Sequence, residues 1–212
     1  IEYKKASQSG GDIATNPPSE TTDGGGAVTG VAQDELEMRY YGTNPPNYIC
    51  FGTTNKSTCT KDQDKYMYRI IGVTKDKGKG RMFKLIKKEA LDTPYYWHNT
   101  SSSDIKWNAS DLFKGLNGIS GGKYSNLFIG NTTYMPSGWS NKIEDVNWKY
   151  GDFTNANQAP ATILQTEQAW NTTVTAKIGL MYVADYYYGV TKTGLNCIDS
   201  ANRTTCRNNN WM

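Results

Sequence analysis

The stretch KYMYRIIGVTKDKGKGRMFKLIKKEA, residues 65–90, decides the fold. Its two outer runs, residues 65–73 and 81–90, are rich in Tyr, Ile, Val, Met, Phe and Leu, a composition that favours strands. Between them lies TKDKGKG, a polar segment with two glycines that suits a tight turn. The stretch therefore predicts an antiparallel β-hairpin.

The residues before the hairpin predict two more strands. DELEMRYYG, residues 34–42, places Leu36, Met38 and Tyr40 on one face against charged neighbours, which is the period of a half-buried strand. NPPN, residues 44–47, is a turn signal, and NYICFG, residues 47–52, follows as a second short strand.

The first 33 residues differ in composition from the rest of the chain. SQSGGDIATNPPSETTDGGGAVTG is rich in Gly, Ser, Thr and Pro and has very few apolar residues, so it cannot supply a core. We therefore predict an extended arm or linker over residues 1–33 and one domain over residues 34–212, a length that allows one sizeable core.

One short amphipathic helix is predicted within NASDLFKGLNG, residues 108–118. Asn108 or Ser110 suits the N-cap, Gly118 suits the stop, and the apolar residues between them have helical spacing. The other residues between 93 and 160 are rich in Trp, Asn and Gly, and predict long ordered loops.

The C-terminal third predicts a strand and a helix. TAKIGLMYV, residues 175–183, has the composition of a buried strand, and ADYYYGV, residues 184–190, predicts a short helix with Asp185 in its first turn. The expected fold class is therefore α+β: a mixed, mostly antiparallel sheet with few short helices and long loops.

Four cysteines form two pairs with the same spacing, Cys50 with Cys59 and Cys197 with Cys206. Each pair brackets a polar loop, which favours two local disulfides, each stabilising the fold by roughly 2–3 kcal/mol. Free thiols and a four-cysteine zinc site are the alternatives, but zinc sites usually have closer spacing. Paired cysteines indicate an oxidising compartment, and hence an extracellular or cell-surface protein.

Composition excludes several classes of function. The net charge is +3 without a basic block, so no nucleic-acid partner is predicted. No apolar run approaches the roughly 20 residues that span a bilayer. The chain begins with Ile1, which fits either removal of a signal peptide or anchor, or a trimmed sequence.

Six Asn-x-Ser/Thr sequons are candidate glycosylation sites if the host glycosylates proteins. Sequons of this kind indicate surface loops. They begin at Asn55, Asn99, Asn108, Asn131, Asn171 and Asn202.

No group of residues predicts catalysis, a metal or a cofactor. His98 is the only histidine, it has no nucleophile motif near it, and we expect a packed or surface residue. Asp62, Asp64 and Asp76 lack the glycine and distal glutamate of a calcium loop, so a solvated turn is expected. Asp145 and Asp152 are a weak candidate for a calcium or sugar site.

Aromatic residues are the main candidates for ligand binding. The chain has 15 Tyr and 6 Trp, and aromatic rings can stack on sugars, although in loop-rich domains they more often form the core. The candidate residues are Trp97, Trp139, Trp148, Tyr186, Tyr187 and Tyr188.

The motifs MRYYGTNPPNYICFG, YMYRIIGV, FKLIKKEA, KIGLMYVADYYYG and NNNWM occur in this order between residues 38 and 212. In order and wording they resemble a family of secreted or surface-anchored domains from low-GC Gram-positive gut bacteria. Many members are ectodomains of anchored or pilin-like proteins without an assigned enzymatic activity, so the resemblance implies no catalytic residue. The expected mixed sheet with long Trp- and Asn-rich loops also resembles C-type-lectin-like folds.

Relatives in that family continue past the NNNWM element with strands that complete the sheet, and this sequence ends at Met212. The resemblance therefore implies an open strand edge near residues 83–90. Another subunit could supply the missing strand, with residues 1–33 as donor, or the sequence is a fragment of a longer protein.

The predicted function is a structural subunit of a bacterial surface appendage or filament, such as a pilus, that self-associates through arm and edge-strand contacts. The alternative is an adhesin or binding module that recognises a glycan or a host protein through its Tyr-, Trp- and Asn-rich loops. An enzyme is the weakest hypothesis, because no residue pattern supports one.

Overall fold

The structure is a computed structural model of the 212-residue chain. It describes residues 24–27, 38–55, 57, 59, 64–76, 79–98, 106–153, 158, 160–190 and 200–212.

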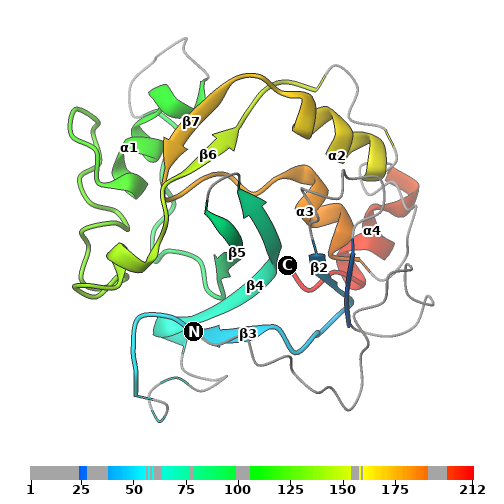
Figure 1. Cartoon of the computed structure of the whole chain (residues 1–212), viewed down its shortest axis with the longest axis horizontal. Helices are drawn as coiled ribbons and strands as arrows, with labels where there is room; N and C mark the ends of the chain where they lie inside the picture. The colour runs from blue at the N-terminus through cyan, green and yellow to red at the C-terminus, as the bar shows by residue number, and fades with distance from the viewer. Residues whose placement is uncertain are drawn as a thin grey trace.

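The predicted hairpin is confirmed, and its first strand, β4, lies at the centre of the main sheet (Figure 1). Strand β4, Met67–Asp76, pairs antiparallel with β5, Gly80–Lys87, from the pair Tyr68↔Lys87 to the pair Asp76↔Gly80. The register shifts between Ile70 and Gly72, where one extra residue of β4 forms an irregularity.

Both short strands predicted before the hairpin are present, and they share the other edge of β4. β3, Tyr48–Cys50, pairs with its first half, and β2, Met38–Tyr41, pairs with Gly72 and Val73. β1, Gly24–Ala27, adds to β2 and completes an antiparallel five-stranded sheet. β1 lies within the predicted arm, so this part of the arm docks on its own domain; the rest of residues 1–33 lies outside the described residues.

A second sheet of two strands lies across from the hairpin (Figure 1). β6, Val146–Lys149, pairs antiparallel with β7, Thr173–Ala176. The predicted strand over residues 175–183 is therefore wrong beyond Ala176. There the backbone bonds to a side chain instead: Ile178 N–H donates to Asn117 Oδ1 at 2.9 Å, and Asn117 Nδ2 donates to the Ile178 carbonyl at 3.0 Å.

Both predicted helices are present. α1, Asp111–Asn117, begins after Ser110, whose hydroxyl accepts from Phe113 N–H at 3.0 Å, and ends at Gly118 in the left-handed region with φ of 67°. α3, Val183–Tyr188, has Asp185 in its first turn. These helices and the antiparallel sheets confirm the α+β class, whereas the C-type-lectin-like arrangement stays a prediction.

Two further helices were not predicted. α2, Pro160–Ala169, begins where the expected loops end, in a segment for which no element was predicted, and α4, Ser200–Asn208, replaces most of the second expected cysteine loop. Both pack on the same side of the molecule as α3 (Figure 1). The core there consists of side chains from these helices, among them Ile163, Leu164, Ala184, Tyr187 and Cys206.

Candidate functional site: a groove between two strand edges

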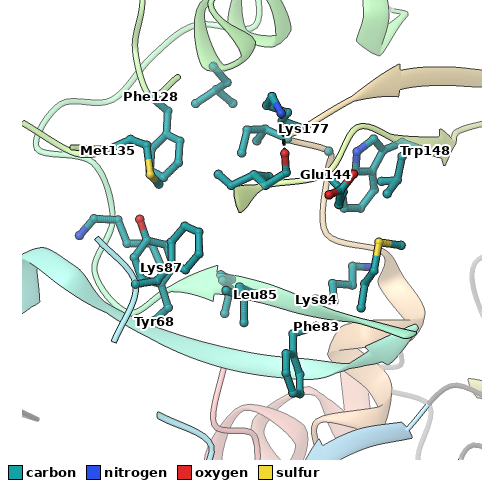
Figure 2. A pocket seen from close by; sticks show the side chains of 18 of the residues that line it. Tyr68, Phe83, Lys84, Leu85, Lys87, Phe128, Met135, Glu144, Trp148 and Lys177 are labelled. Carbon is teal, nitrogen blue, oxygen red and sulfur yellow. Dashed lines mark hydrogen bonds between the residues drawn. The ribbon is translucent and has the colours of Figure 1, made fainter. Parts of the chain in front are cut away.

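A cavity of about 1390 Å³ lies between the hairpin and the second sheet. Figure 2 shows Tyr68, Leu85 and Lys84 of the hairpin on one side, with Lys177 and Trp148 across the opening. We call this cavity the edge groove. Its apolar lining includes Ile49, Phe51, Tyr68, Met82, Leu85, Ile86, Leu116, Phe128, Met135, Trp139, Ile143, Val146, Trp148, Leu164 and Ile178.

The edge groove runs along the outer edge of β5. Every residue from Met82 to Lys87 lines it. Successive side chains of a strand point to opposite faces, so a cavity that touches all of them reaches the outer edge of the strand. Ile49 of β3 and Tyr68 of β4 also line it, so the cavity covers part of one face of the sheet as well. The opposite edge of β5 is paired with β4, and among the strands that the structure describes β5 has no other partner.

The same reasoning places the edge groove beside β6. All four residues of that strand, Val146–Lys149, line the cavity, and the other edge of β6 is paired with β7. The edge groove therefore separates an outer strand of one sheet from an outer strand of the other. Strands that pair are about 4.7–4.9 Å apart, so a strand added at either edge would lie within the edge groove.

Hydrogen bonds at the strand ends fix which backbone groups face the edge groove. Lys88 N–H donates to the Met67 carbonyl at 3.1 Å, so by alternation the N–H and C=O of Leu85 point away from β4. Tyr150 N–H donates to the Thr172 carbonyl at 3.0 Å, which in the same way directs the N–H and C=O of Asn147 away from β7.

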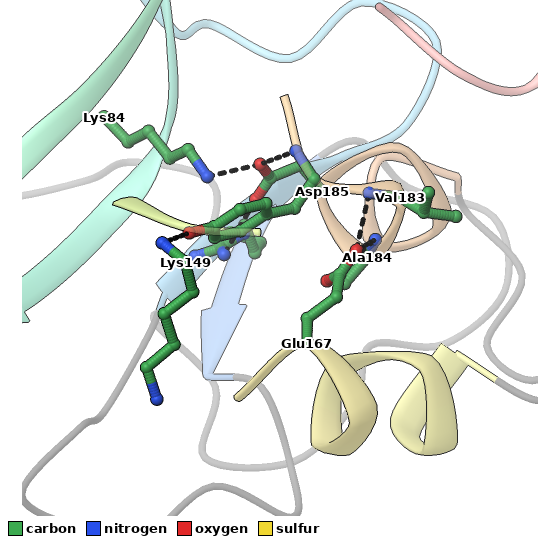
Figure 3. A network of polar contacts seen from close by, with 8 residues as sticks. Lys84, Lys149, Glu167, Val183, Ala184 and Asp185 are labelled. Atoms are coloured by element: carbon green, nitrogen blue, oxygen red, sulfur yellow. Dashed lines mark hydrogen bonds and ion pairs between the residues drawn. The ribbon is translucent and has the colours of Figure 1, made fainter. Parts of the chain in front are cut away.

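Behind the edge groove lies a buried cluster of charges (Figure 3). The carboxylate of Asp185 contacts Arg39 Nη2 at 2.8 Å and Lys84 Nζ at 2.5 Å, and all three side chains are buried. It also accepts from Tyr182 N–H at 3.0 Å. Burial alone would raise the pKa of Asp185, but attraction to Lys84 and Arg39 outweighs it and holds the pKa below its usual value.

Glu167 is the second buried acid of this cluster, with only 2 % of its surface exposed. Its carboxylate accepts from Val183 N–H at 2.8 Å and from Ala184 N–H at 3.4 Å, so it caps the beginning of α3. Burial raises the pKa of Glu167 to about 7, although both backbone donors work against this rise. The charge of Asp185 nearby adds to the rise.

The stability of the fold should therefore depend on pH near neutrality. The folded state holds the Glu167 proton more tightly than the unfolded state, whose pKa is about 4.5, so stability falls as the pH rises from 4.5 to 7. The shift corresponds to about 3 kcal/mol. In Glu167→Gln, which keeps an acceptor oxygen but cannot ionise, we expect this pH dependence to vanish.

Denaturant unfolding of the wild type and Glu167→Gln at several pH values in this window measures the effect. Asp185 stays ionised throughout, because Lys84 and Arg39 hold its pKa below the usual value. If the free energy of unfolding varied with pH in the same way in both proteins, Glu167 would not be the group responsible for the pH dependence.

The structure brings only two of the six predicted aromatic ligands to the edge groove. Trp139 and Trp148 line it, and the indole N–H of Trp148 donates to the Ala176 carbonyl at 2.8 Å. Trp97 instead packs on Trp107, with ring centroids 5.2 Å apart. The other three belong to the core around α3: Tyr187 is buried, and Tyr186 and Tyr188 pack against that core.

The disulfide between Cys50 and Cys59 is present, with 5.9 Å between their Cα atoms. Cys206 is also disulfide-bonded and is fully buried, while Cys197 lies outside the described residues. The sequon residues Asn55, Asn108 and Asn171 are exposed, Asn131 and Asn202 are half-buried, and Asn99 lies outside the described residues.

The weaker candidates for chemistry do not form a site in the part of the chain that the structure describes. His98 Nδ1 lies 3.9 Å from the Asp111 carboxylate on a half-buried surface. Asp145 pairs with Lys177 at 3.5 Å. Among the described residues there is no cluster of potential metal ligands, and none of their helices has the length and apolar character needed to cross a bilayer. Asp62 lies outside the described residues.

Sequence reasoning missed the edge groove and the charge cluster behind it. Arg39, Lys84, Glu167 and Asp185 come from four elements separated by up to 146 positions, and no local pattern joins them. The signal that was present is the hairpin itself, since Arg81, Lys84 and Lys87 of its second strand are three positions apart, which places basic residues on both faces of the strand.

Comparisons with known proteins do not assign the chain to a family. No family model matches it, and searches of curated proteins and of solved structures find no similar protein. The function therefore has to be argued from the geometry of the edge groove.

Proposed function

We propose that the chain is a structural subunit of a bacterial cell-surface appendage, and that copies assemble by adding a strand of one copy to the edge groove of the next. The observation that carries this proposal is the position of the groove between the outer edges of β5 and β6. An apolar groove beside an open strand edge is a template for strand addition. When donor and acceptor surfaces differ, such contacts run on into filaments.

The disulfide supports an extracellular location. Cys50 and Cys59 close a short loop next to β3, and bonds of this kind persist in oxidising compartments. An adhesin that binds a glycan is the second candidate, because Trp139 and Trp148 line the edge groove and aromatic rings can stack on sugars. A glycan array tests this second candidate. Binding of a glycan by the monomeric chain, with loss of that binding when both tryptophans are replaced by alanine, would favour it.

Replacing Leu85 separates the backbone contribution from the side chain. Leu85→Pro removes the N–H that faces the edge groove, and leaves in place the bonds between β5 and β4. Leu85→Ala removes the same side chain but keeps that N–H. We expect the wild type and Leu85→Ala to form assemblies that are multiples of 23.6 kDa, and Leu85→Pro to stay monomeric.

Light scattering on the oxidised proteins measures the assembled mass, and circular dichroism confirms that each variant is folded. Deleting residues 1–23, which precede β1, then tests whether the arm is the donor. A wild type that stays at 23.6 kDa at every concentration would overturn the proposal.

A further inference from the structure

One amine and one carboxylate are enclosed together in the charge cluster behind the edge groove. Lys84 Nζ donates to Asp185 Oδ2 at 2.5 Å, and the two side chains are 8 % and 0 % exposed. Figure 3 shows the lysine reaching the carboxylate from β5, while Asp185 belongs to the first turn of α3. The two residues lie 101 positions apart, so a bond between them would join distant parts of the chain.

Burial distinguishes this contact from three other pairs of a lysine with an acid. In those pairs the amine and the carboxylate are 3.3–3.5 Å apart, and each acid is at least 51 % exposed. They are Lys79 with Glu144, Lys88 with Glu89, and Lys177 with Asp145. Water reaches these three carboxylates, whereas the carboxylate of Asp185 is shielded from it, and exclusion of water protects a bond from hydrolysis.

Neighbouring groups hold both side chains of the buried pair in place. Arg39 Nη2 contacts Asp185 Oδ1 at 2.8 Å, and Tyr182 N–H donates to Asp185 Oδ2 at 3.0 Å. The ring of Tyr182 also contacts the amine, with Lys84 Nζ 4.1 Å from the ring centroid. Two groups that are held together in this way react as if their concentrations were very high.

The pair can become neutral without the entry of another group. A guanidinium stays charged in proteins, whereas a lysine can release a proton and act as a nucleophile. Transfer of a proton from Lys84 Nζ to Asp185 Oδ2, along the existing hydrogen bond, gives an amine and a carboxylic acid. Burial favours this neutral pair. Lys84 and Arg39 hold the pKa of Asp185 below its usual value, which opposes the transfer, so we expect any reaction to be slow.

We propose that Lys84 and Asp185 condense to an amide, which links β5 covalently to α3. The amine attacks Cγ of Asp185 and forms the C–N bond, while negative charge develops on Oδ1 beside Arg39 Nη2. A second proton then passes from the nitrogen to Oδ2, the Cγ–Oδ2 bond breaks, and one water leaves. The step needs no oxidant or cofactor. It is independent of the proposed function, since a monomeric chain can carry the amide.

Mass spectrometry of the full chain, reduced and denatured after a period in the folded state, tests the proposal. We expect the wild type to lose about 18 Da, the mass of one water, in a fraction that grows with the time of incubation. Trypsin does not cleave at an acylated lysine. Digestion should therefore yield one branched peptide that joins the segment around Lys84 to the segment around Asp185.

Two lysine substitutions supply a matched pair of variants. Lys84→Arg keeps a positive charge beside Asp185 but is too weak a nucleophile to form the amide, so this variant should keep its full mass. Lys177→Arg changes a lysine whose partner, Asp145, is exposed, and should lose water as the wild type does. Circular dichroism confirms that each variant is folded.

Three results would overturn the proposal: a folded wild type that keeps its full mass throughout incubation, an equal loss of water in Lys84→Arg, or a branched peptide that joins other residues. Cyclisation at Asp23 and Gly24 would also release water, but it would persist in Lys84→Arg and give no branched peptide. If Lys84→Arg does not fold, the branched peptide of the wild type decides alone.

Discussion

Replacing Asp185 with alanine is expected to lower the free energy of unfolding by about 3–5 kcal/mol. The substitution leaves Arg39 and Lys84 without their shared carboxylate, and these side chains are only 3 % and 8 % exposed. A buried charge that loses its partner costs far more than an exposed one. Asp185→Ala also removes the acceptor for Tyr182 N–H at the beginning of α3. Denaturant unfolding measures the loss.

Two further variants separate charge from hydrogen bonding. Asp185→Asn keeps an acceptor for Tyr182 N–H and should recover about 1 kcal/mol. Adding Lys84→Met to Asp185→Ala removes one of the two unpaired charges, so the double variant should be more stable than Asp185→Ala alone. A loss below about 1 kcal/mol for Asp185→Ala would show that the cluster contributes little.

Trp211→Ala is the second substitution with a large expected effect, about 3–5 kcal/mol. The Arg69 guanidinium lies between the rings of Tyr48 and Trp211, 4.5 Å and 4.3 Å from their centroids. Arg69 Nη1 donates to the Trp211 carbonyl at 2.9 Å, and the Trp211 indole N–H donates to the Tyr40 carbonyl at 3.1 Å. The residue therefore fastens the end of the chain to β2 and β4.

A double-mutant cycle isolates the contact between the guanidinium and the indole. Arg69→Ala and Trp211→Ala together should cost less than the sum of the single losses, with a coupling of about 1–2 kcal/mol. Trp211→Phe keeps a ring but not the indole N–H, and should cost about 1 kcal/mol through the lost bond alone. Additive single effects would contradict direct stacking.

Elements with a local signal could be predicted from the sequence. The hairpin of β4 and β5 follows from two strand-forming runs around a glycine-containing turn, and α1 follows from Ser110, Gly118 and the spacing between them. In α3 the position of Asp185 in the first turn was also predictable, but its main contacts were not. Lys84 lies 101 positions away, and only the fold brings it to the carboxylate.

Elements that depend on distant partners were missed for the same reason. β6 has four residues and forms by pairing with β7, which lies 24 positions further along the chain. α4 contains Asn, Thr and Arg in a segment that looked like a loop, and its buried residue is the disulfide-bonded Cys206. The strand expected through Ile178 fails because Asn117 bonds to both backbone groups of that residue.

The edge groove was partly predictable. An open strand edge near residues 83–90 was expected from the resemblance, and β5 borders the groove with all its residues from Met82 onward. The second edge, on β6, could not be foreseen, because the strand itself was not predicted. The ion pairs behind the groove join Lys84 of β5 to Asp185 of α3, and Asp185 to Arg39 of β2.

The measurement that tests strand addition most directly is hydrogen exchange of the Leu85 amide in the assembled protein and in the dissociated monomer. This N–H faces the edge groove and not β4, so its exchange reports on an added strand. The neighbouring Ile86 amide faces β4 and serves as an internal reference. We expect assembly to slow exchange at Leu85 and to leave Ile86 unchanged. Equal exchange at Leu85 in both forms would show that copies do not join through this edge.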